Sequence, residues 1–473
     1  MSVVHYDLLV LGAGPGGYAA AVRAARAGKT VGLIERDQLG GVCLNWGCIP
    51  TKALLHSAGL WRALKGAGRH GISIEGASFD YAAVHRRSRQ VVGRLVKGLE
   101  GLMKKAGVEV IAGEGRLEGS RDGRPRVCVR AAGKGGGIEE RIYTADDLIL
   151  ATGSVMKEVP GLPMDLKQVI GSREAVDLTE LPESLLVIGA GAIGLEFADL
   201  FATFGVKVTV IEMMPQILPT EDVDVVQVLR NGLAKRGIKI HTATRLANAQ
   251  VDAAGVHGEL VIEGQDPQPI SAERVLVAVG VTGAIHNLGL AEAGVATEGG
   301  FVRVDEHHAT SAPHIYAIGD LTGSPMLAHA ASAAGIRAVE HMLGLPVPEG
   351  LAWIPAAVFT HPQLASVGAR ERDLKEQGVA YRSGTFPFSA LGRAVAEGEG
   401  AGFVKVLLDE EDGRLLGAHI VGPGASELIA ELTLAGTRQL SAQALLDTVH
   451  THPTLAEAVP EAVGAALGVG IHI

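Results

Sequence analysis

The sequence predicts an α/β protein that contains two separate βαβ-based domains and a C-terminal α+β domain. Two glycine-rich segments, "DLLVLGAGPGGYAAA" and "SLLVIGAGAIGLEFA", each have the pattern of a buried strand, a tight turn and the start of a helix. The second copy follows the first after 177 residues, which is far too long for a solenoid repeat. After about residue 350 the pattern changes to "VKVLLDEEDGRLLGAHIVG", two strands around an Asp-Gly turn, and then to mostly helical sequence.

Length, composition and charge restrict the class of protein. A chain of 473 residues has room for about three domains, and its 47% hydrophobic and 20% charged residues are typical of a globular protein. The net charge of −10, without a block of Lys or Arg, argues against nucleic acid as the main partner. The apolar runs are shorter than the ~18 residues that suggest a membrane span, and the start of the chain lacks the features of a signal peptide. With only three cysteines, we expect a cytoplasmic protein of a reducing compartment, with no nucleic-acid or membrane partner.

The first glycine-rich segment fits a Rossmann-like dinucleotide site. Its glycines Gly12, Gly14 and Gly17 permit a tight turn, close approach of the backbone to a pyrophosphate, and close packing of helix against strand. The phosphates would then lie at the N-terminus of the following helix. Glu35 ends the second strand 18 residues after Gly17, where a carboxylate can accept hydrogen bonds from ribose hydroxyls.

The second segment repeats this arrangement with Gly189, Gly191 and Gly194, and with Glu212 at the same offset. One such motif is often a glycine-rich turn of an unrelated α/β protein, but two copies with matching acids indicate two bound dinucleotides. No Lys or Arg follows Glu212 before Arg230, so a 2′-phosphate would meet a carboxylate and no nearby guanidinium. This site therefore favours NAD over NADP, whereas the first would accept NAD or FAD.

Two of the three cysteines, Cys43 and Cys48, lie in "GGVCLNWGCIPTKALL". As a structural staple they would close a very short loop, worth roughly 2 kcal/mol, which a reducing compartment would oppose. A zinc site needs three or four ligands, and the remaining Cys128 lies in a strand-like segment, so no metal is expected. A redox dithiol fits better, because Pro50 suits the first turn of a helix whose N-terminus would stabilise a Cys48 thiolate. A flavin exchanges electrons with both a dithiol and a nicotinamide, which favours FAD at the first site.

The cysteine segment closely resembles the redox-active segment of flavin-dependent disulfide reductases, and within that family the dihydrolipoamide dehydrogenases, the E3 components of 2-oxo acid dehydrogenase complexes. The resemblance extends over "GAGPGGYAAA", "ATGS", "GAGAIGLEFA", "AIGDLTGSPMLAHAA", "FTHPQLASVG" and "HTHPTLAEAV". It implies a homodimer with active sites shared between the subunits. The implied division of the chain is an FAD-binding domain over 1–150, an NAD-binding domain over 151–280, a central domain over 281–350 and a dimerisation domain over 351–473.

The resemblance also implies residues along the cofactors. Lys52 would lie beside the flavin, in an ion pair with Glu196. Trp46 and Thr51 depart from the family pattern, as does the segment "AVGVTGAIHNLGL". The other implied positions are Gly115, Thr152, Gly153, Ser154, Asp320, Met326, Leu327, Ala328, His329 and Gly280.

The catalytic residues follow from the same resemblance. Cys43 is implied to exchange with the substrate, and Cys48 to contact the flavin. His452 in "HTHPTLAEAV" is the implied base, with Pro453 opening a helix and Glu457 accepting the proton of the far ring nitrogen. The base would come from the partner subunit. The implied reaction oxidises protein-bound dihydrolipoamide to lipoamide and reduces NAD, with the lipoyl group carried by another protein.

Other functions compete with this interpretation. A glutathione reductase should carry basic residues where Glu212 stands, and a mercuric reductase should carry an extra C-terminal cysteine pair, which the sequence lacks. A soluble transhydrogenase should lack the redox cysteines. A catalytically silent scaffold flavoprotein in a large complex would not need both redox cysteines and the His452–Glu457 pair.

Overall fold

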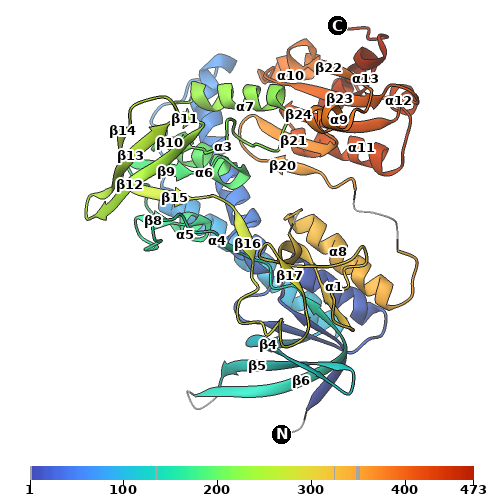
Figure 1. The fold of residues 1–473 in the computed structure, drawn as a ribbon. Helices are drawn as coiled ribbons and strands as arrows, with labels where there is room; N and C mark the ends of the chain where they lie inside the picture. Colours follow the sequence, from blue (N-terminus) through green and yellow to red (C-terminus); the bar gives the residue numbers. More distant parts are fainter. Residues whose placement is uncertain (1–2, 134–136, 324, 348–351) are drawn as a thin grey trace. The chain divides into compact units, whose positions relative to one another are not determined.

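A computed structural model describes residues 3–133, 137–323, 325–347 and 352–473. Helices and strands both occur throughout the chain, and they alternate in the segments that contain the two glycine motifs, as expected for the α/β class (Figure 1). No helix within these residues is both long and apolar enough to cross a membrane.

The chain forms two compact units, each assembled from three segments. The division into four domains at residues 150, 280 and 350 stays a prediction, and its last boundary lies outside the described residues. Unit 1 consists of Met1–Ala53, Ala83–Lys157 and Gly280–Gly350, and unit 2 consists of Leu54–Ala82, Glu158–Val279 and Leu351–Ile473.

A seven-stranded sheet forms the core of unit 1, in the order β3-β2-β1-β6-β5-β4, with β19 also paired to β6. Strands β3, β2, β1, β6 and β19 are parallel to one another where they pair, whereas β5 and β4 continue the sheet in antiparallel fashion. Residues 8–11 are all buried, which confirms the predicted strand with two covered faces. The strands are β1 (Val4–Leu11), β2 (Val31–Glu35), β3 (Glu109–Ala112), β4 (Glu114–Arg121), β5 (Arg124–Ala132), β6 (Ile138–Leu150) and β19 (Ile315–Ala317).

The hairpin predicted between the two dinucleotide motifs is formed by β5 and β6. Their antiparallel register extends from Ala132 opposite Ile138 to Arg126 opposite Thr144, while the turn at 134–136 lies outside the described residues. The end of β6 is buried and pairs in parallel with β1, which confirms the buried strand predicted after the hairpin.

Helices α1 and α8 lie side by side in unit 1 (Figure 1). Their contact is close because it is made by glycines: a Cβ at Gly16 would lie 2.9 Å from Ala331 O, and a Cβ at Gly335 would collide with Gly16 O. Helix α3 passes from unit 1 into unit 2, and α4 begins in unit 2. The helices and short strands are α1 (Pro15–Arg26), α2 (Gly41–Asn45), α3 (Cys48–Gly66), α4 (Tyr81–Ala106), η2 (Gly319–Thr322), α8 (Ala328–Met342), β7 (Ser154–Met156), β16 (Val281–Gly283), β17 (Thr297–Glu298) and β18 (Phe301–Val302).

Unit 2 contains a second parallel sheet, in the order β11-β10-β9-β15-β8, and a three-stranded antiparallel sheet formed by β12, β13 and β14. Its strands β9 and β10 flank helix α6, so the second glycine motif lies in the predicted strand–turn–helix–strand unit. The elements are β8 (Val169–Ile170), α5 (Ser172–Asp177), β9 (Ser184–Ile188), α6 (Ala192–Thr203), β10 (Lys207–Ile211), α7 (Val223–Lys235), β11 (Lys239–His241), β12 (Thr244–Asp252), β13 (Gly255–Ile262), β14 (Gln268–Ala272), β15 (Arg274–Val277) and the 3-10 helix η1 (Ala67–His70).

The C-terminal part of unit 2 is built on an antiparallel sheet in the order β20-β21-β24-β23-β22. Strands β23 and β24 are the pair predicted around the Asp-Gly turn, and five α-helices flank or follow the sheet within residues 352–473, as the α+β prediction expects. The elements are β20 (Ala356–Val358), β21 (Gln363–Gly368), α9 (Glu371–Gln377), β22 (Tyr381–Pro387), η3 (Phe388–Ala390), α10 (Gly392–Glu397), β23 (Phe403–Asp409), β24 (Leu415–Gly422), α11 (Ala425–Thr437), α12 (Ala442–Asp447), η4 (Leu455–Glu457) and α13 (Ala458–Leu467).

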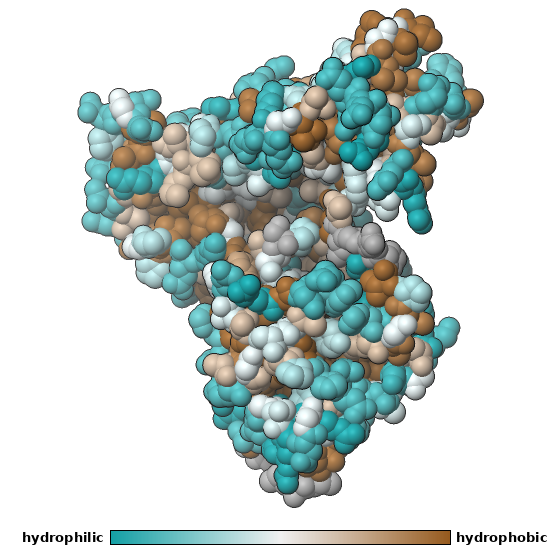
Figure 2. Space-filling view, turned by 45° about the vertical axis from the view of Figure 1, so that its right-hand side comes forward, coloured by the Kyte–Doolittle hydropathy of each residue, from teal (hydrophilic) through white to brown (hydrophobic). Residues whose placement is uncertain are grey.

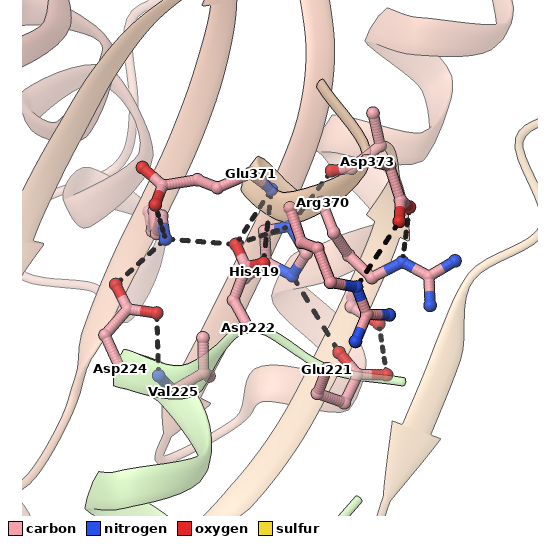
Figure 3. A network of polar contacts seen from close by, with 12 residues as sticks. Glu221, Asp222, Asp224, Val225, Arg370, Glu371, Asp373 and His419 are labelled. Carbon is pink, nitrogen blue, oxygen red and sulfur yellow. Dashed lines mark hydrogen bonds and ion pairs between the residues drawn. The ribbon is translucent and has the colours of Figure 1, made fainter. Parts of the chain in front are cut away.

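A buried network of charges joins the start of α7 to this antiparallel sheet (Figure 3). Lys405 on β23 is only 2% exposed, and its Nζ lies 3.0 Å from Asp222 Oδ2 and 2.9 Å from Asp224 Oδ2. Burial opposes the ammonium charge, but the hydrogen bonds with Asp224 and Asp222 outweigh it and raise the pKa of Lys405. His419 on β24 lies beside this lysine's partners, with Nε2 3.5 Å from Asp222 Oδ2. Charged side chains therefore tie the sheet to the start of α7.

We predict that Lys405→Met lowers the free energy of unfolding by about 3–5 kcal/mol, because it leaves the buried Asp222 carboxylate without its cation. The measurement is urea denaturation at fixed protein concentration. Lys375→Met is the matched control, since Lys375 Nζ lies 3.3 Å from Glu371, which Lys405 also approaches, but its side chain is 65% exposed. The control should lower the free energy of unfolding far less, because water already solvates and screens its ion pair. Equal losses in the two variants would contradict the prediction.

Candidate active site

The two glycine turns have nearly the same backbone geometry, one in each unit. The first glycine of each turn has a positive φ, +106° at Gly12 and +102° at Gly189. A Cβ at Gly12 would come closer than 3.0 Å to Ala151 O, and a Cβ at Gly189 would come equally close to Ala278 O. Only glycine fits both the conformation and the space, so both turns have the backbone that the sequence predicts.

The other two glycines of each motif have opposite surroundings. A Cβ at Gly17 or Gly194 would collide with the carbonyl oxygen of the first glycine, so helix and turn pack backbone to backbone. In contrast, a Cβ at Gly14 or Gly191 would meet nothing within 4 Å. These middle glycines are the N-caps of α1 and α6 and provide no side-chain cap. Open space in front of uncapped backbone N–H groups suits the phosphates of a dinucleotide.

Glu35 and Glu212 are oriented by the turns that they follow. In each case Oε2 accepts a hydrogen bond from the N–H of the residue after the first glycine, at 2.8 Å for Glu35 and 2.7 Å for Glu212. Oε1 accepts from the N–H two positions beyond the acid, at 2.9 Å in both. Each carboxylate oxygen keeps further lone pairs, which ribose hydroxyls would need. The residues of both turns therefore fit a dinucleotide.

Residues predicted along the first cofactor come together from separate segments of unit 1. Ser154 Oγ donates to Asp320 Oδ2 at 2.8 Å, and Thr152 Oγ1 donates to Ala284 O at 3.2 Å. Burial raises the pKa of Asp320, and the hydrogen bond from Ser154 offsets part of this effect. Gly115 lies in β4, where a Cβ would collide with a side chain of β1.

The remaining predicted cofactor positions lie at chain turns and at one helix start. Leu327 is the N-cap of α8, and Ala328 and His329 are its first two residues. Met326 is 40% exposed. Gly153 and Gly280 have positive φ values of +75° and +99°. Their roles toward the cofactors stay predictions.

Cys43 and Cys48 form a disulfide in unit 1, with their Cα atoms 4.6 Å apart. Cys43 lies in α2, and Cys48 is the first residue of α3. Pro50 is the third residue of this helix and so lies in its first turn, as the sequence predicts. A proline is tolerated there because its missing N–H has no partner to lose. Cys48 thus lies where the partial positive charge of the helix N-terminus stabilises a thiolate.

Lys52 and Glu196 belong to different units. Lys52 lies in α3, four residues after Cys48, and is half-buried. Glu196 lies in α6, is 5% exposed, and accepts a hydrogen bond from Phe359 N at 3.0 Å through Oε1. The ion pair between the two side chains stays a prediction.

Two residues that the sequence analysis did not identify hold the loop of the redox cysteines. Asn45 is fully buried, and its Nδ2 donates to Leu39 O at 2.9 Å and to Gly41 O at 3.0 Å. Arg89 on α4 donates to Asn45 O at 2.9 Å. The position of the polar Asn45 between two cysteines could have suggested its role from the sequence. Arg89 is 44 residues away, and nothing in the sequence links it to this loop.

In unit 2, His452 and Glu457 form the predicted pair. His452 Nδ1 lies 2.8 Å from Glu457 Oε1, and the histidine side chain is 79% exposed. Glu457 Oε2 accepts a hydrogen bond from Thr454 N at 2.8 Å. This N–H, together with His452, holds the pKa of Glu457 below its ordinary value. The carboxylate therefore stays ionised at neutral pH and orients the ring, with Nε2 on the opposite side from the pair.

Pro453 does not open a helix, contrary to the sequence prediction. The 3-10 helix η4 begins at Leu455, and α13 begins at Ala458. Thr454 is the N-cap because its side chain and that of Glu457 form a capping box with the backbone. The same contact that orients the pair therefore also determines where the helix begins.

A second histidine–carboxylate pair lies two residues before His452 and was not predicted. His450 Nε2 lies 2.9 Å from Glu431 Oε1, and Nδ1 lies 3.0 Å from Thr448 O. The His450 side chain is only 9% exposed. Of the two histidines in "HTH", one is thus enclosed by its partners and the other faces solvent.

Family models match almost the whole chain. The model for pyridine nucleotide-disulphide oxidoreductases matches residues 6–335, and the model for their dimerisation domain matches residues 354–463. A dihydrolipoyl dehydrogenase from Chlorobaculum parvum is 45% identical over 467 residues, which cover 98% of each chain. A dihydrolipoyl dehydrogenase from Bacillus subtilis is 39% identical over 471 residues, which cover 99% of each chain.

Solved structures have the same fold. LpdA from Mycobacterium tuberculosis superimposes with a TM-score of 0.89 at 31% identity, covering 98% of this chain and 99% of that one. The Cu(II) complex of RclA, an HOCl-induced flavoprotein disulfide reductase from Escherichia coli, superimposes with a TM-score of 0.84 at 27% identity, with the same coverage. With its two dinucleotide turns, its Cys43–Cys48 disulfide and these full-length matches, the chain belongs to the pyridine nucleotide-disulphide oxidoreductase family.

Proposed function

We propose that this enzyme oxidises protein-bound dihydrolipoamide to lipoamide and reduces NAD. The observation that carries the proposal is the Cys43–Cys48 disulfide at the start of α3, in a chain that matches relatives named dihydrolipoyl dehydrogenase over its full length. The exposed His452–Glu457 pair supplies a base for a thiol substrate. The same chemistry suggests the cytoplasm, where a dithiol carried by a partner protein remains reduced.

FAD and NAD are the cofactors of this family, and the residues of the two turns fit them. In the proposal, the turn from Gly12 to Gly17 with Glu35 holds FAD, and the turn from Gly189 to Gly194 with Glu212 holds NAD. A bound FAD would supply two-electron chemistry between the dithiol and NAD. Lys52 would hold its ammonium beside the flavin, paired with Glu196.

The first half of the thiol chemistry uses His452 and the disulfide. His452 Nε2 removes the proton from one thiol of dihydrolipoamide, while Glu457 stabilises the resulting imidazolium at Nδ1. The substrate thiolate attacks Cys43 Sγ, and the Cys43–Cys48 bond breaks. Cys48 leaves with the electron pair as a thiolate, which the N-terminus of α3 stabilises. This asymmetry makes Cys43 the sulfur that exchanges with substrate.

The second half releases the product. The second thiol of the substrate attacks the sulfur that is bonded to Cys43, and this closes the disulfide ring of lipoamide. Cys43 leaves and takes up the proton held by His452, and the proton of the second thiol replaces it on the base. The chain then carries a Cys43 thiol and a Cys48 thiolate, having gained the two electrons that the substrate lost.

The match to a dimerisation domain supports a homodimer. Apolar side chains are exposed at the C-terminal end of the chain (Figure 2), where Val469, Ile471 and Ile473 are 59%, 83% and 55% exposed. Val449, three residues before His452, is 95% exposed. In the proposal, a second copy of the chain covers apolar surface of this kind, and each subunit supplies the base to its partner's disulfide.

We predict that NAD is preferred over NADP by at least about 100-fold in kcat/KM, because Glu212 would repel a 2′-phosphate. Glu212→Gln keeps a side-chain acceptor for the turn but removes the charge. It should lower the ratio of kcat/KM with NAD to kcat/KM with NADP. Glu35→Gln makes the same change in the first turn and should leave the ratio unaltered. Steady-state rates with both nucleotides measure it, and equal rates in the unmutated enzyme would refute the assignment.

The roles of the two cysteines predict different spectra. Two-electron reduction without NAD should produce a long-wavelength absorption band from a Cys48 thiolate beside the flavin. Cys48→Ser should abolish this band, whereas Cys43→Ser should show it without any reductant, because its Cys48 cannot form the disulfide. A band that persists in Cys48→Ser would show that the two roles are reversed.

A shared active site predicts complementation between inactive subunits. His452→Gln should lower dihydrolipoamide oxidation by roughly 10²–10⁴-fold, the usual cost of losing a general base. Cys43→Ser chains are inactive for a different reason. If the two kinds of chain are mixed and exchanged, each heterodimer has one site with both an intact Cys43 and an intact His452. Activity that stays near zero after exchange would show that the base acts within its own chain.

A further inference from the structure

The loop that carries His452 has polar contacts with its surroundings near both of its ends. It runs between α12 and η4, from Thr448 to Thr454, and contains no helix or strand. At its C-terminal end, the Glu457 carboxylate bonds Thr454 N and the His452 ring. Near its N-terminal end, the contact is made by His450, whose partner Glu431 lies on α11.

The hydrogen bonds of His450 determine its charge. Nε2 faces a carboxylate oxygen of Glu431, and Nδ1 faces the carbonyl oxygen of Thr448. Both partners are acceptors only, so both ring nitrogens must donate. Only the doubly protonated, cationic imidazole has two N–H groups. The His450 side chain is only 9% exposed, and its contact with Glu431 is partly buried, so the ring is largely shielded from water on that side.

We propose that His450 is a cationic positioning residue, which fastens the loop of the base to α11 through Glu431 and balances the charge around His452. This inference rests on the proposed function, because it assigns a task to the loop of the catalytic base. The charged groups around the His450 ring are Glu431 from α11 and Glu457 from η4, and the charge of His450 contributes to the low pKa of Glu457. His452 is the titratable neighbour on the same loop.

The charges of His450 and Glu431 balance each other. Removing either side chain's charge leaves the other charge uncompensated near the base, His452. His450→Gln leaves the Glu431 carboxylate, which favours the protonated base. The acid limb of the pH profile of kcat/KM should then move to higher pH. Glu431→Gln leaves the His450 cation, which disfavours a second positive charge on the loop, so that the limb should move to lower pH. Each shift should be about half a pH unit, since the base is exposed and screened.

The experiment compares these two variants with Glu461→Gln. Glu461 Oε1 lies 2.6 Å from His472 Nδ1, so the control makes the same change to a histidine–carboxylate pair elsewhere in unit 2. For dihydrolipoamide, kcat should fall about 10-fold in both loop variants with little change in KM, because the base is less well held. The rate of NADH oxidation by an artificial acceptor needs no base and should be unchanged. The control should keep both rates and the acid limb of the unmutated enzyme.

Opposite shifts of the acid limb support the proposal. Shifts in the same direction, or unshifted profiles in both variants, overturn it. A structural disturbance common to both variants would not move the acid limb in opposite directions, whereas removing opposite charges should. Thermal unfolding of each holoenzyme identifies a variant that merely folds poorly. If the unmutated enzyme does not oxidise dihydrolipoamide, the proposed function has failed and the profiles say nothing of His450.

A spectroscopic measurement tests the charge without turnover. In holoenzyme labelled with ¹⁵N-histidine, both ring nitrogens of His450 should have the chemical shifts of protonated nitrogens at neutral pH. The resonances are assigned by their absence in His450→Gln. One protonated and one unprotonated nitrogen would overturn the proposal, whatever the enzyme's activity.

Discussion

Close approach of backbone to backbone at the two glycine turns is the constraint on which the rest of this molecule depends. Because the third glycine lies against the carbonyl of the first, the helix starts directly above the strand, and the acid of the next strand reaches the turn. In unit 2 the consequence extends further along α6. Glu196 and Asp199 on that helix accept hydrogen bonds from Phe359 N at 3.0 Å and His361 N at 2.8 Å. The helix that begins at the nucleotide turn therefore also anchors the start of the antiparallel sheet.

The local environment gives different properties to histidines that lie in similar sequence motifs. Burial, with the nearby Arg62, Arg236 and Arg69, lowers the pKa of His361 to about 3, so its imidazole stays neutral. His450 is enclosed between two acceptors. Of the three histidines in the two "HP"-containing motifs, only His452 combines wide exposure with a carboxylate on one ring nitrogen, which is the arrangement that a general base needs.

Local patterns predicted most of the architecture, since each depends on residues close together in the chain. The buried run at 8–11, the hairpin before β6 and the Asp-Gly turn between β23 and β24 were all readable in this way. Helix boundaries were less accurate. The helix that contains Pro50 begins two residues before the proline, at Cys48, and Thr454 rather than Pro453 is the N-cap of the last 3-10 helix. Several proline placements satisfy the same local rule, and tertiary contacts select among them.

The sequence by itself determined the two strand–turn–helix units, the acids that serve them and the redox cysteines, because short spacing and residue type suffice for each. The histidine–glutamate pair could be read only through the resemblance of its segment to a family motif. Only the tertiary structure decided which distant side chains support these features. Arg89 bonds the loop between the cysteines, Lys405 is enclosed by carboxylates of α7, and Glu431 fastens His450. These partners are separated by 19 to 183 residues in sequence. A buried polar or charged group loses its contacts with water and needs a partner close in space. Distance along the chain does not determine which residue that partner is.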